Sequence, residues 1–314
     1  MFSFASLVSV EYIAPDKIPK PIIALACATI LFGTATPLLK ILVDGMAPLL
    51  LIALLAIGSG AGVLCWRGVS GPRFTTGQCC AGRREKYLLA GTVVIGGFVA
   101  PVVQCFALTV TAAATASLLL NFEIVATVLL AFMVFHEPTD KKTGLALVLI
   151  FAGSILLSWN GESILGLSLG AIGIIISGFF WGVDNNCMAH ISAYPPGLIA
   201  LCKVIFGGSI AGVLVIVLGE PLPGAELIVL ALLTGFFSYG LGLILFIVAL
   251  RDMGAARAGA IYAAAPFIGC IASLLVFSDP LGSRFWLAVP LFVAGALIVI
   301  REQWTREYPI KPGT

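Results

Sequence analysis

The feature that most constrains this chain is a series of long apolar runs, each bounded by a short turn-forming stretch. The hydrocarbon core of a bilayer is about 30 Å thick, and a helix that crosses it needs about 20 apolar residues. The breaks fall at turn signals such as Asp44-Gly45 and Asp279-Pro280. Read this way, the sequence predicts ten membrane-spanning helices, at residues 21–42, 47–66, 87–109, 112–135, 143–160, 164–190, 197–219, 225–250, 254–277 and 283–300.

The composition favours the same interpretation. Hydrophobic residues make up 60% of the chain and charged residues 10%, whereas a soluble domain has about 25% charged residues. In water, such a fold would expose large apolar patches. In lipid, backbone groups must be paired internally, so only helices and closed barrels span a membrane, and barrel strands alternate over about ten residues. The continuous runs therefore predict an all-α, polytopic membrane protein.

Basic residues are sorted between the loops on the two sides of the predicted membrane. The loop between the second and third runs has a single acid, Glu85, against five basic residues: Arg67, Arg73, Arg83, Arg84 and Lys86. The positive-inside rule places this loop in the cytoplasm. Threading an even number of spans from it puts both termini in the cytoplasm and leaves only Lys40 and Arg284 at the outer ends. Residues 1–20 have no basic start or cleavage site typical of a signal peptide, and we expect a cytoplasmic or interfacial segment there.

The chain also resembles itself. Residues 107–153 align without a gap on residues 249–295, and the matched pairs include Val134-Phe135 with Val276-Phe277 and Pro138 with Pro280. Each half then has five spans, and an odd number inverts the second half relative to the first. Inverted repeats are typical of transporters, whose site lies near the midplane between the repeats. The predicted organisation is an N-terminal segment (1–20), two repeats (21–160 and 161–301) and a cytoplasmic C-terminal tail (302–314).

Several short motifs also match a known family. Phe32-Gly33 and Trp181-Gly182 occur early in the first helix of each half, and an Ala-Leu…Ala-Ala…Ser-Leu-Leu…Glu stretch runs from Ala107 to Glu137. In these features the chain resembles the EamA-type transporters of the drug/metabolite transporter superfamily. The resemblance implies a ten-helix exporter or exchanger of small metabolites that works by alternating access. It does not name the substrate, and the first copy departs from the family pattern at Ile124, where the second has Pro266.

Glu123, midway along the fourth predicted span, is the leading candidate for a functional group. Ionisable residues inside a membrane are costly and usually face a cavity or a partner. One interpretation is a carboxyl group that couples proton movement to transport or binds a cationic group of the substrate. The other is a structural glutamate that is protonated or hydrogen-bonded to a neighbouring helix.

The sixth and seventh spans contribute further polar candidates. Asp184 and Lys203 are expected at similar depth, so they form either an ion pair that ties two helices together or a gate or substrate contact. Amide side chains suit either role because they donate and accept hydrogen bonds. The predicted substrate-binding or coupling residues are Glu123, Asn121, Asp184, Asn185, Asn186, Lys203, Trp181, Tyr239 and Tyr262.

Other functional classes find less support in the sequence. It contains two histidines, no CxxC pair and no G-x-x-x-x-G-K-[ST] motif, so we expect no metal, no cofactor and no nucleotide-driven pump. Nothing suggests a nucleic-acid partner. The leading hypothesis is a secondary transporter of small organic metabolites such as amino acids or amines, with protons as a candidate coupling ion. The alternatives are a non-transporting membrane scaffold or sensor and, with less support, an intramembrane enzyme.

Overall fold

The computed structural model describes residues 21–71, 82–136, 140–159, 168–191, 194–253, 255–277 and 281–307, and most of them are helical. We group the helices of the first repeat into segments 1 to 5: α1 (Pro21–Gly45); α2 (Pro48–Ser70); α3 (Arg83–Gly91) with η4 (Thr92–Val99) and α4 (Ala100–Leu108); α5 (Ala113–Leu119) with α6 (Phe122–Phe135); and α7 (Lys141–Ser158). Segments 6 to 10 follow in the same order: α8 (Leu169–His190); α9 (Pro196–Leu218); α10 (Ala225–Thr234) with η5 (Gly235–Gly242) and α11 (Leu243–Met253); α12 (Ala255–Tyr262) with α13 (Ala265–Val276); and α14 (Ser283–Glu307).

These segments confirm the predicted ten-helix membrane fold. Within the described ranges, eight helices are long and apolar enough to cross a membrane, and α13 is a shorter apolar helix. Helix α8 has 22 residues, which is enough to span, but Asp184, Asn185 and Asn186 lower its hydropathy. The third span begins at Arg83 instead of residue 87, and the last extends to Glu307. Residues 1–20, 164–167 and 308–314, on which parts of the prediction fall, lie outside the described residues.

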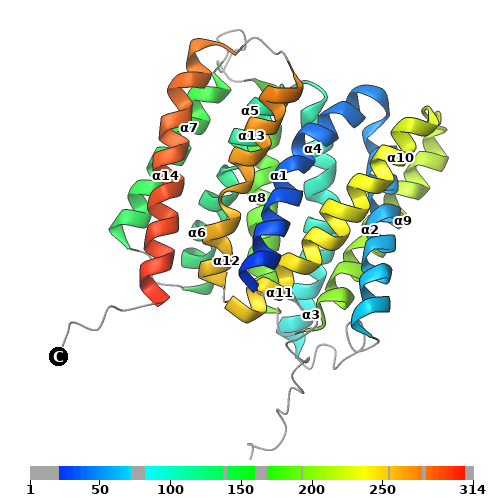
Figure 1. The fold of residues 1–314 in the computed structure, drawn as a ribbon, viewed down its shortest axis with the longest axis horizontal. Coiled ribbons are helices and arrows are strands. Elements are labelled where there is room, and N and C mark those ends of the chain that lie inside the picture. The colour runs from blue at the N-terminus through cyan, green and yellow to red at the C-terminus, as the bar shows by residue number, and fades with distance from the viewer. Residues whose placement is uncertain are drawn as a thin grey trace, which may run out of the picture.

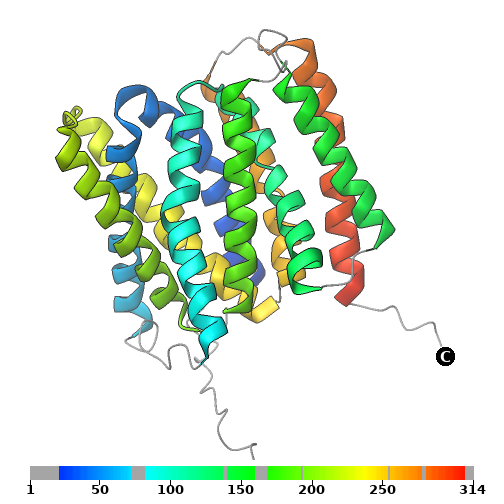
Figure 2. The same ribbon diagram turned by 180° about the vertical axis from the view of Figure 1, so that it is seen from behind.

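The two halves have opposite directions. In Figure 1, α1 runs upward from the lower face of the bundle, whereas α8, the first helix of the second half, runs downward. Figure 2 shows the same bundle from behind, with α8 beside α4 and α6. The ends of the described chain, at Pro21 and Glu307, lie at the same lower face. The structure therefore has the inverted five-helix repeats that the sequence match predicts.

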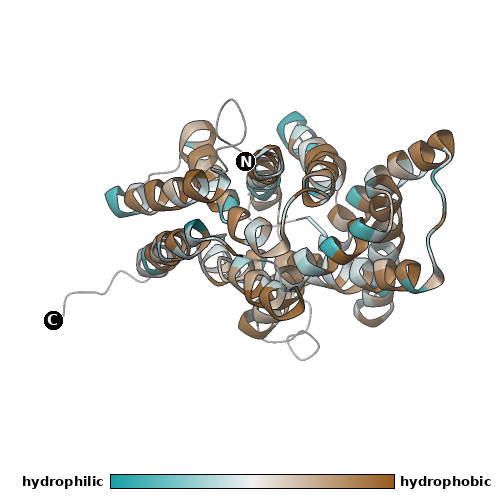
Figure 3. Ribbon diagram, turned by 90° about the horizontal axis from the view of Figure 1, so that it is seen from above, coloured by the Kyte–Doolittle hydropathy of each residue, from teal (hydrophilic) through white to brown (hydrophobic). Residues whose placement is uncertain are grey.

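Eight segments form a closed ring in the described part of the chain. Neighbours pack in the order 4, 6, 3, 7, 2, 8, 1, 9 and back to 4, while segments 5 and 10 pair with each other outside the ring. Each contact between the repeats has a counterpart, because segment 4 against 6 mirrors segment 9 against 1, and segment 7 against 3 mirrors segment 2 against 8. Viewed from above, the ring helices are mostly apolar (Figure 3). Because the ring contains segments of both repeats, both repeats face its centre.

Matching segments of the two repeats share the same helix irregularities. Segments 3 and 8 each contain an eight-residue π-helical stretch, η4 and η5. In segment 3, Pro101 has no N–H to pair with the carbonyl of Gly97, which favours a wider turn. Segments 4 and 9 are each interrupted at mid-length, at 120–121 and at 263–264. π-Helical turns often occur at functional sites, and transporter sites often contain interrupted helices.

Candidate functional site

The centre of the ring holds a cavity of about 80 Å³. Its depth is central, since Phe32 lies 11 residues from Pro21 and 13 from Gly45, and Tyr239 lies 14 residues from both Ala225 and Met253. Every ring segment contributes to its wall, and segments 5 and 10 do not contribute. The lining residues are Phe32, Ile52, Leu55, Ala56, Ser59, Gly96, Gly97, Pro101, Glu123, Trp181, Asp184, Asn185, Met188, Lys203, Val204, Tyr239, Leu243, Phe246 and Tyr262.

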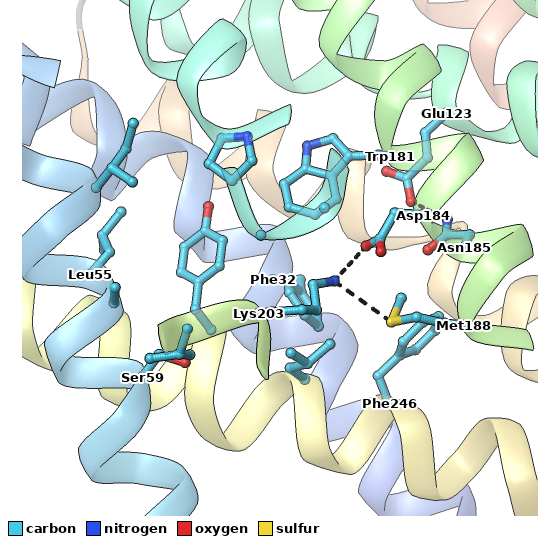
Figure 4. A pocket seen from close by; sticks show the side chains of 18 of the residues that line it. Phe32, Leu55, Ser59, Glu123, Trp181, Asp184, Asn185, Met188, Lys203 and Phe246 are labelled. Carbon is cyan, nitrogen blue, oxygen red and sulfur yellow. Dashed lines mark hydrogen bonds and ion pairs between the residues drawn. The ribbon is translucent and has the colours of Figure 1, made fainter. Parts of the chain in front are cut away.

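A buried ion pair joins segments 6 and 7 at the wall of this cavity. Lys203 Nζ lies 2.6 Å from Asp184 Oδ2, and the two side chains are 6% and 0% exposed. The hydroxyl of Thr92, on segment 3, donates to the other oxygen of Asp184, and Lys203 Nζ also lies 5.8 Å from the centre of the Trp181 ring. Figure 4 shows Lys203 pointing toward both Asp184 and Met188. Asp184 and Lys203 therefore form a buried pair of opposite charges.

The π-helical stretch of segment 3 makes room for this pair. A Cβ atom at Gly96 would fall on the carboxyl group of Asp184, and one at Gly97 would lie 2.9 Å from the backbone oxygen of Lys203. Real Cβ atoms do not make such short contacts, so a side chain at either position would force segments 6 and 7 away from segment 3. The glycines thus allow the ion pair to lie directly against the backbone of the first repeat.

Glu123 lies in a different environment from Asp184. It occupies the first turn of α6, just after the interruption of segment 4, where the helix N-terminus favours a negative charge. Its carboxyl oxygen accepts a hydrogen bond of 2.6 Å from the side-chain amide of Asn185. Among the ion pairs of the described residues, none involves Glu123. In the described structure, Glu123 thus has an amide partner but no cationic one.

An aromatic cluster forms another part of the wall. Phe32 is in edge-to-face contact with three rings, with centroid distances of 6.4 Å to Tyr239, 6.3 Å to Phe246 and 5.6 Å to Tyr262. The rings of Phe246 and Tyr262 also meet, at 4.7 Å. Such contacts add to the stability that apolar burial provides and fix the orientation of the rings. The cluster joins segments 1, 8 and 9.

Segment 6 is hydrogen-bonded to the first repeat along much of its length. Ser177 Oγ donates to the carbonyl of Ala100 at 3.1 Å, and the indole N–H of Trp181 donates to Gln104 Oε1 at 2.9 Å. Asn186 Nδ2 donates to the carbonyl of Thr127 at 3.0 Å. These bonds, with those of Asp184 and Asn185, hold segment 6 against segments 3 and 4.

The structure brings seven of the nine predicted site residues to the cavity: Glu123, Trp181, Asp184, Asn185, Lys203, Tyr239 and Tyr262. Asp184 and Lys203 form an ion pair, which is one of the two roles that the sequence suggested for them. Asn121 and Asn186 do not line the cavity. Asn121 is fully buried at the interruption of segment 4, where Nδ2 donates to the carbonyl of Leu118 and Oδ1 has no hydrogen-bond partner among the described residues.

Sequence reasoning missed several lining residues. Phe32 was noticed as a repeat motif but not as part of a site, and Ser59 and Phe246 were not singled out. Thr92, which does not line the cavity but donates to Asp184, was also missed. Ser59 Oγ is buried at the cavity wall and has no hydrogen-bond partner among the described residues. Gly96 and Tyr239 occupy matched positions of the π-helical stretches 92–99 and 235–242, a correspondence that appears only in the structure.

Buried apolar side chains pack toward both faces of the bundle. Near the face where α1 begins, fully buried residues include Leu25, Ile191 and Ile199. Near the other face, they include Leu42, Leu51 and Leu108. The cavity lies at a depth between these two groups of buried residues and is partly open.

A ring of helices from two inverted repeats around a central, partly polar cavity defines the class of membrane transporters built from inverted repeats. A sequence model of the EamA-like transporter family matches residues 19–159 and 168–301. This chain belongs to that family, which is part of the drug/metabolite transporter superfamily.

Two similar proteins are in line with this assignment. A protein of Methanothermobacter thermautotrophicus, described as an uncharacterized transporter, is 26% identical over 292 residues, which cover 88% of this chain and 85% of that protein. A solved structure, titled "Crystal structure of protein", is 17% identical, covers 92% of this chain and 99% of the solved chain, and superposes with a TM-score of 0.65. The solved structure supports the fold, and the relative supports a transporter.

Proposed function

We propose that this protein is a secondary active exporter or exchanger of small organic metabolites, such as amino acids or amines, that works by alternating access. The observation that carries the proposal is the central cavity, which is walled by segments of both inverted repeats. In this mechanism the cavity opens to one side of the membrane while the bundle stays closed on the other, so it faces each side in turn. Seven of the nine predicted residues line the cavity, and we propose that these seven bind the substrate or couple transport: Glu123, Trp181, Asp184, Asn185, Lys203, Tyr239 and Tyr262.

The polar contacts of the cavity connect parts that would move relative to each other. Asn185 on segment 6 holds Glu123 on segment 4, and Asp184 on segment 6 is held by Thr92 on segment 3 and Lys203 on segment 7. Segments 3 and 4 belong to the first repeat, and segments 6 and 7 to the second. A ligand that competes for these groups changes contacts between the repeats, which is what a carrier needs in order to link binding to a conformational change.

In this proposal Glu123 carries the coupling proton. A carboxyl group beside a ligand cavity can be neutralised either by a proton or by a ligand, and the two then compete for one site. The proton gradient across the membrane would drive transport in this way. Exchange of one metabolite for another is the second mode that the same cavity supports.

We propose that both termini face the cytoplasm of a plasma or inner membrane. The described basic residues at helix ends lie mostly at the face where α1 begins: Arg67, Arg83, Arg84, Lys86, Lys141, Lys142, Arg251 and Arg301. The opposite face holds only Lys40 and Arg284 among the described basic residues, together with Asp44, Glu220 and Glu226, whereas acidic residues such as Glu85 and Glu302 also occur at the basic face. The positive-inside rule assigns the basic face to the cytoplasm.

The test is a substrate-library screen in reconstituted vesicles, with and without an imposed pH gradient. We expect saturable uptake of at least one small metabolite, enhanced by the gradient in the wild type and not in Glu123→Gln. Glu226→Gln, at an exposed position of α10, removes the same charge far from the cavity and should behave as the wild type. Gradient-driven uptake that persists in Glu123→Gln contradicts proton coupling by this residue but leaves transport intact.

The alternatives make different predictions in the same screen. A scaffold or sensor would bind partners or ligands without any uptake. An intramembrane enzyme would convert a compound instead of moving it. The two histidines give little support for catalysis, because neither lines the cavity: His190 stacks on Phe135 at the end of α8, and His136 ends α6.

A further inference from the structure

We propose that the preferred ligand is a small monocationic amine with an aromatic or compact apolar body and no carboxylate. The inference rests on the proposed function and narrows its substrate class. It comes from the distribution of charge and aromatic rings around the cavity, which differs between the two halves of the ring.

The wall of the cavity has a polar arc and an aromatic arc. The polar arc is formed by segments 4, 6, 3 and 7 and includes Glu123, Asn185, Asp184 and Lys203, with Trp181 as its one aromatic side chain among the described lining residues. The aromatic arc is formed by segments 2, 8, 1 and 9 and includes Phe32, Tyr239, Phe246 and Tyr262. The inverted symmetry exchanges the two arcs, so matched segments of the two repeats present different kinds of side chain to the cavity. Figure 4 shows Glu123, Asp184 and Asn185 gathered together, away from Leu55 and Ser59.

The charges of the polar arc do not balance. It has two carboxyl groups and one ammonium group, and the ammonium group of Lys203 is paired with Asp184 at 2.6 Å. When Glu123 is ionised, the cavity therefore has one negative charge whose described partner is a neutral amide. A buried charge without a counter-ion is unstable and is satisfied by a proton or a bound cation. A monocationic ligand completes the balance, whereas an anionic ligand adds to the imbalance.

A carboxylate on the ligand finds no free cation at this site. Lys203 is the one cationic residue among the described residues that line the cavity. It is 6% exposed and bound to Asp184, which is itself enclosed by Thr92 and Gly96. To bind Lys203, a ligand carboxylate would have to leave Asp184 buried and unpaired, which is costly. The geometry thus disfavours amino acids relative to amines of the same shape.

The aromatic arc suits the rest of such a ligand. Four rings from three segments present faces and edges to the cavity, and aromatic faces attract cations as well as apolar groups. The cavity measures about 80 Å³, which is roughly half the volume of an engineered cavity of about 150 Å³ that takes up benzene. A compact amine therefore suits this site, a one-ring amine requires the side chains of the wall to move apart, and a large drug-like molecule does not fit.

The test measures equilibrium binding to the purified full-length protein by titration calorimetry at pH 6 and pH 8, with three matched probes. These are 2-phenylethylamine, phenylalanine, which adds a carboxylate to it, and 3-phenylpropionate, which keeps the carboxylate and lacks the amine. We expect 2-phenylethylamine to bind at least about tenfold more tightly than either of the others. 3-Phenylpropionate lacks the ammonium group that would contact Glu123, and the carboxylate of phenylalanine offsets the gain from that contact because it adds a second negative charge. Binding should be tighter at pH 8 than at pH 6, since protons compete for Glu123.

Two variants of Glu123 and a control at Glu226 separate the role of Glu123 from general damage. Glu123→Gln keeps an acceptor for Asn185, so the protein should fold, bind the amine about tenfold or more weakly and lose its pH dependence. Glu123→Asp keeps the charge and should retain part of the affinity, and Glu226→Gln should bind as the wild type. The inference is overturned if phenylalanine or 3-phenylpropionate binds as tightly as the amine, if Glu123→Gln binds the amine normally, or if no amine binding is found. Amine binding without uptake in vesicles would instead refute the proposed transport while upholding the ligand class.

Discussion

Gly96 offers a sharp test of the site geometry, because replacing it with alanine adds a single methyl group directly against Asp184. That methyl group has no room, since a Cβ atom at this position would overlap sterically with the carboxyl group of Asp184. Either α8 moves away from η4, or the carboxyl group turns away from Thr92 and Lys203. Overpacking alone costs about 1–3 kcal/mol, and loosening the buried ion pair adds to this, since breaking such a pair fully costs about 3–5 kcal/mol.

We therefore expect Gly96→Ala to lower the free energy of unfolding by about 2–4 kcal/mol, despite the gain of up to about 1 kcal/mol from replacing glycine in a helix. The assay is reversible unfolding with SDS in mixed micelles, followed by far-UV circular dichroism. Gly212→Ala in α9 is the matched control, because nothing lies within 4 Å of its Cβ position. It should be neutral or slightly stabilising. A Gly96→Ala protein as stable as Gly212→Ala would refute the account of this close contact.

Three further predictions follow from the polar contacts. Lys203→Met should destabilise the protein by about 3–5 kcal/mol because it leaves Asp184 buried without a cation, and the double variant with Asp184→Asn should recover much of this loss in the same unfolding assay. Equal stability of the single variant and the wild type would argue against a tight pair. Glu123→Gln should abolish the extra uptake that a pH gradient produces in vesicles, and unchanged gradient dependence would rule out this residue as the proton carrier. Lys142→Ala should cost about 0.5 kcal/mol or less, although Lys142 lies 2.9 Å from Glu302, because its side chain is 68% exposed; a loss above 1 kcal/mol would contradict this.

Much of the fold was predictable from the sequence because its main determinants are long-range patterns. Apolar runs of spanning length predict the helices, and the sorting of basic residues favours an even number of them. The match of residues 107–153 with 249–295 predicts the inversion of the halves. The π-helical stretches and the interruption at 120–121 were not predicted, because they change the local hydrogen bonding without changing hydropathy.

The candidate site was predictable in part, and the limits have physical causes. Depth in the membrane is enough to place Asp184 and Lys203 together. Rotation about the helix axis is not readable from adjacent polar residues, since neighbours differ by about 100°. Asn185 therefore faces Glu123 while Asn186 bonds to the backbone of Thr127. The role of Gly96 depends on what packs against it, which only the folded structure reveals.

The measurement that tests the central claim most directly is counterflow in vesicles that contain the purified protein. Vesicles are preloaded with an unlabelled compound, and uptake of the same labelled compound is followed without any ion gradient. A carrier with a single alternating site predicts a transient accumulation of label above its equilibrium level, because the outward-moving unlabelled molecules return the site to the outside. Absence of this overshoot for every compound that binds the protein would contradict the account of the cavity as the site of an alternating-access carrier.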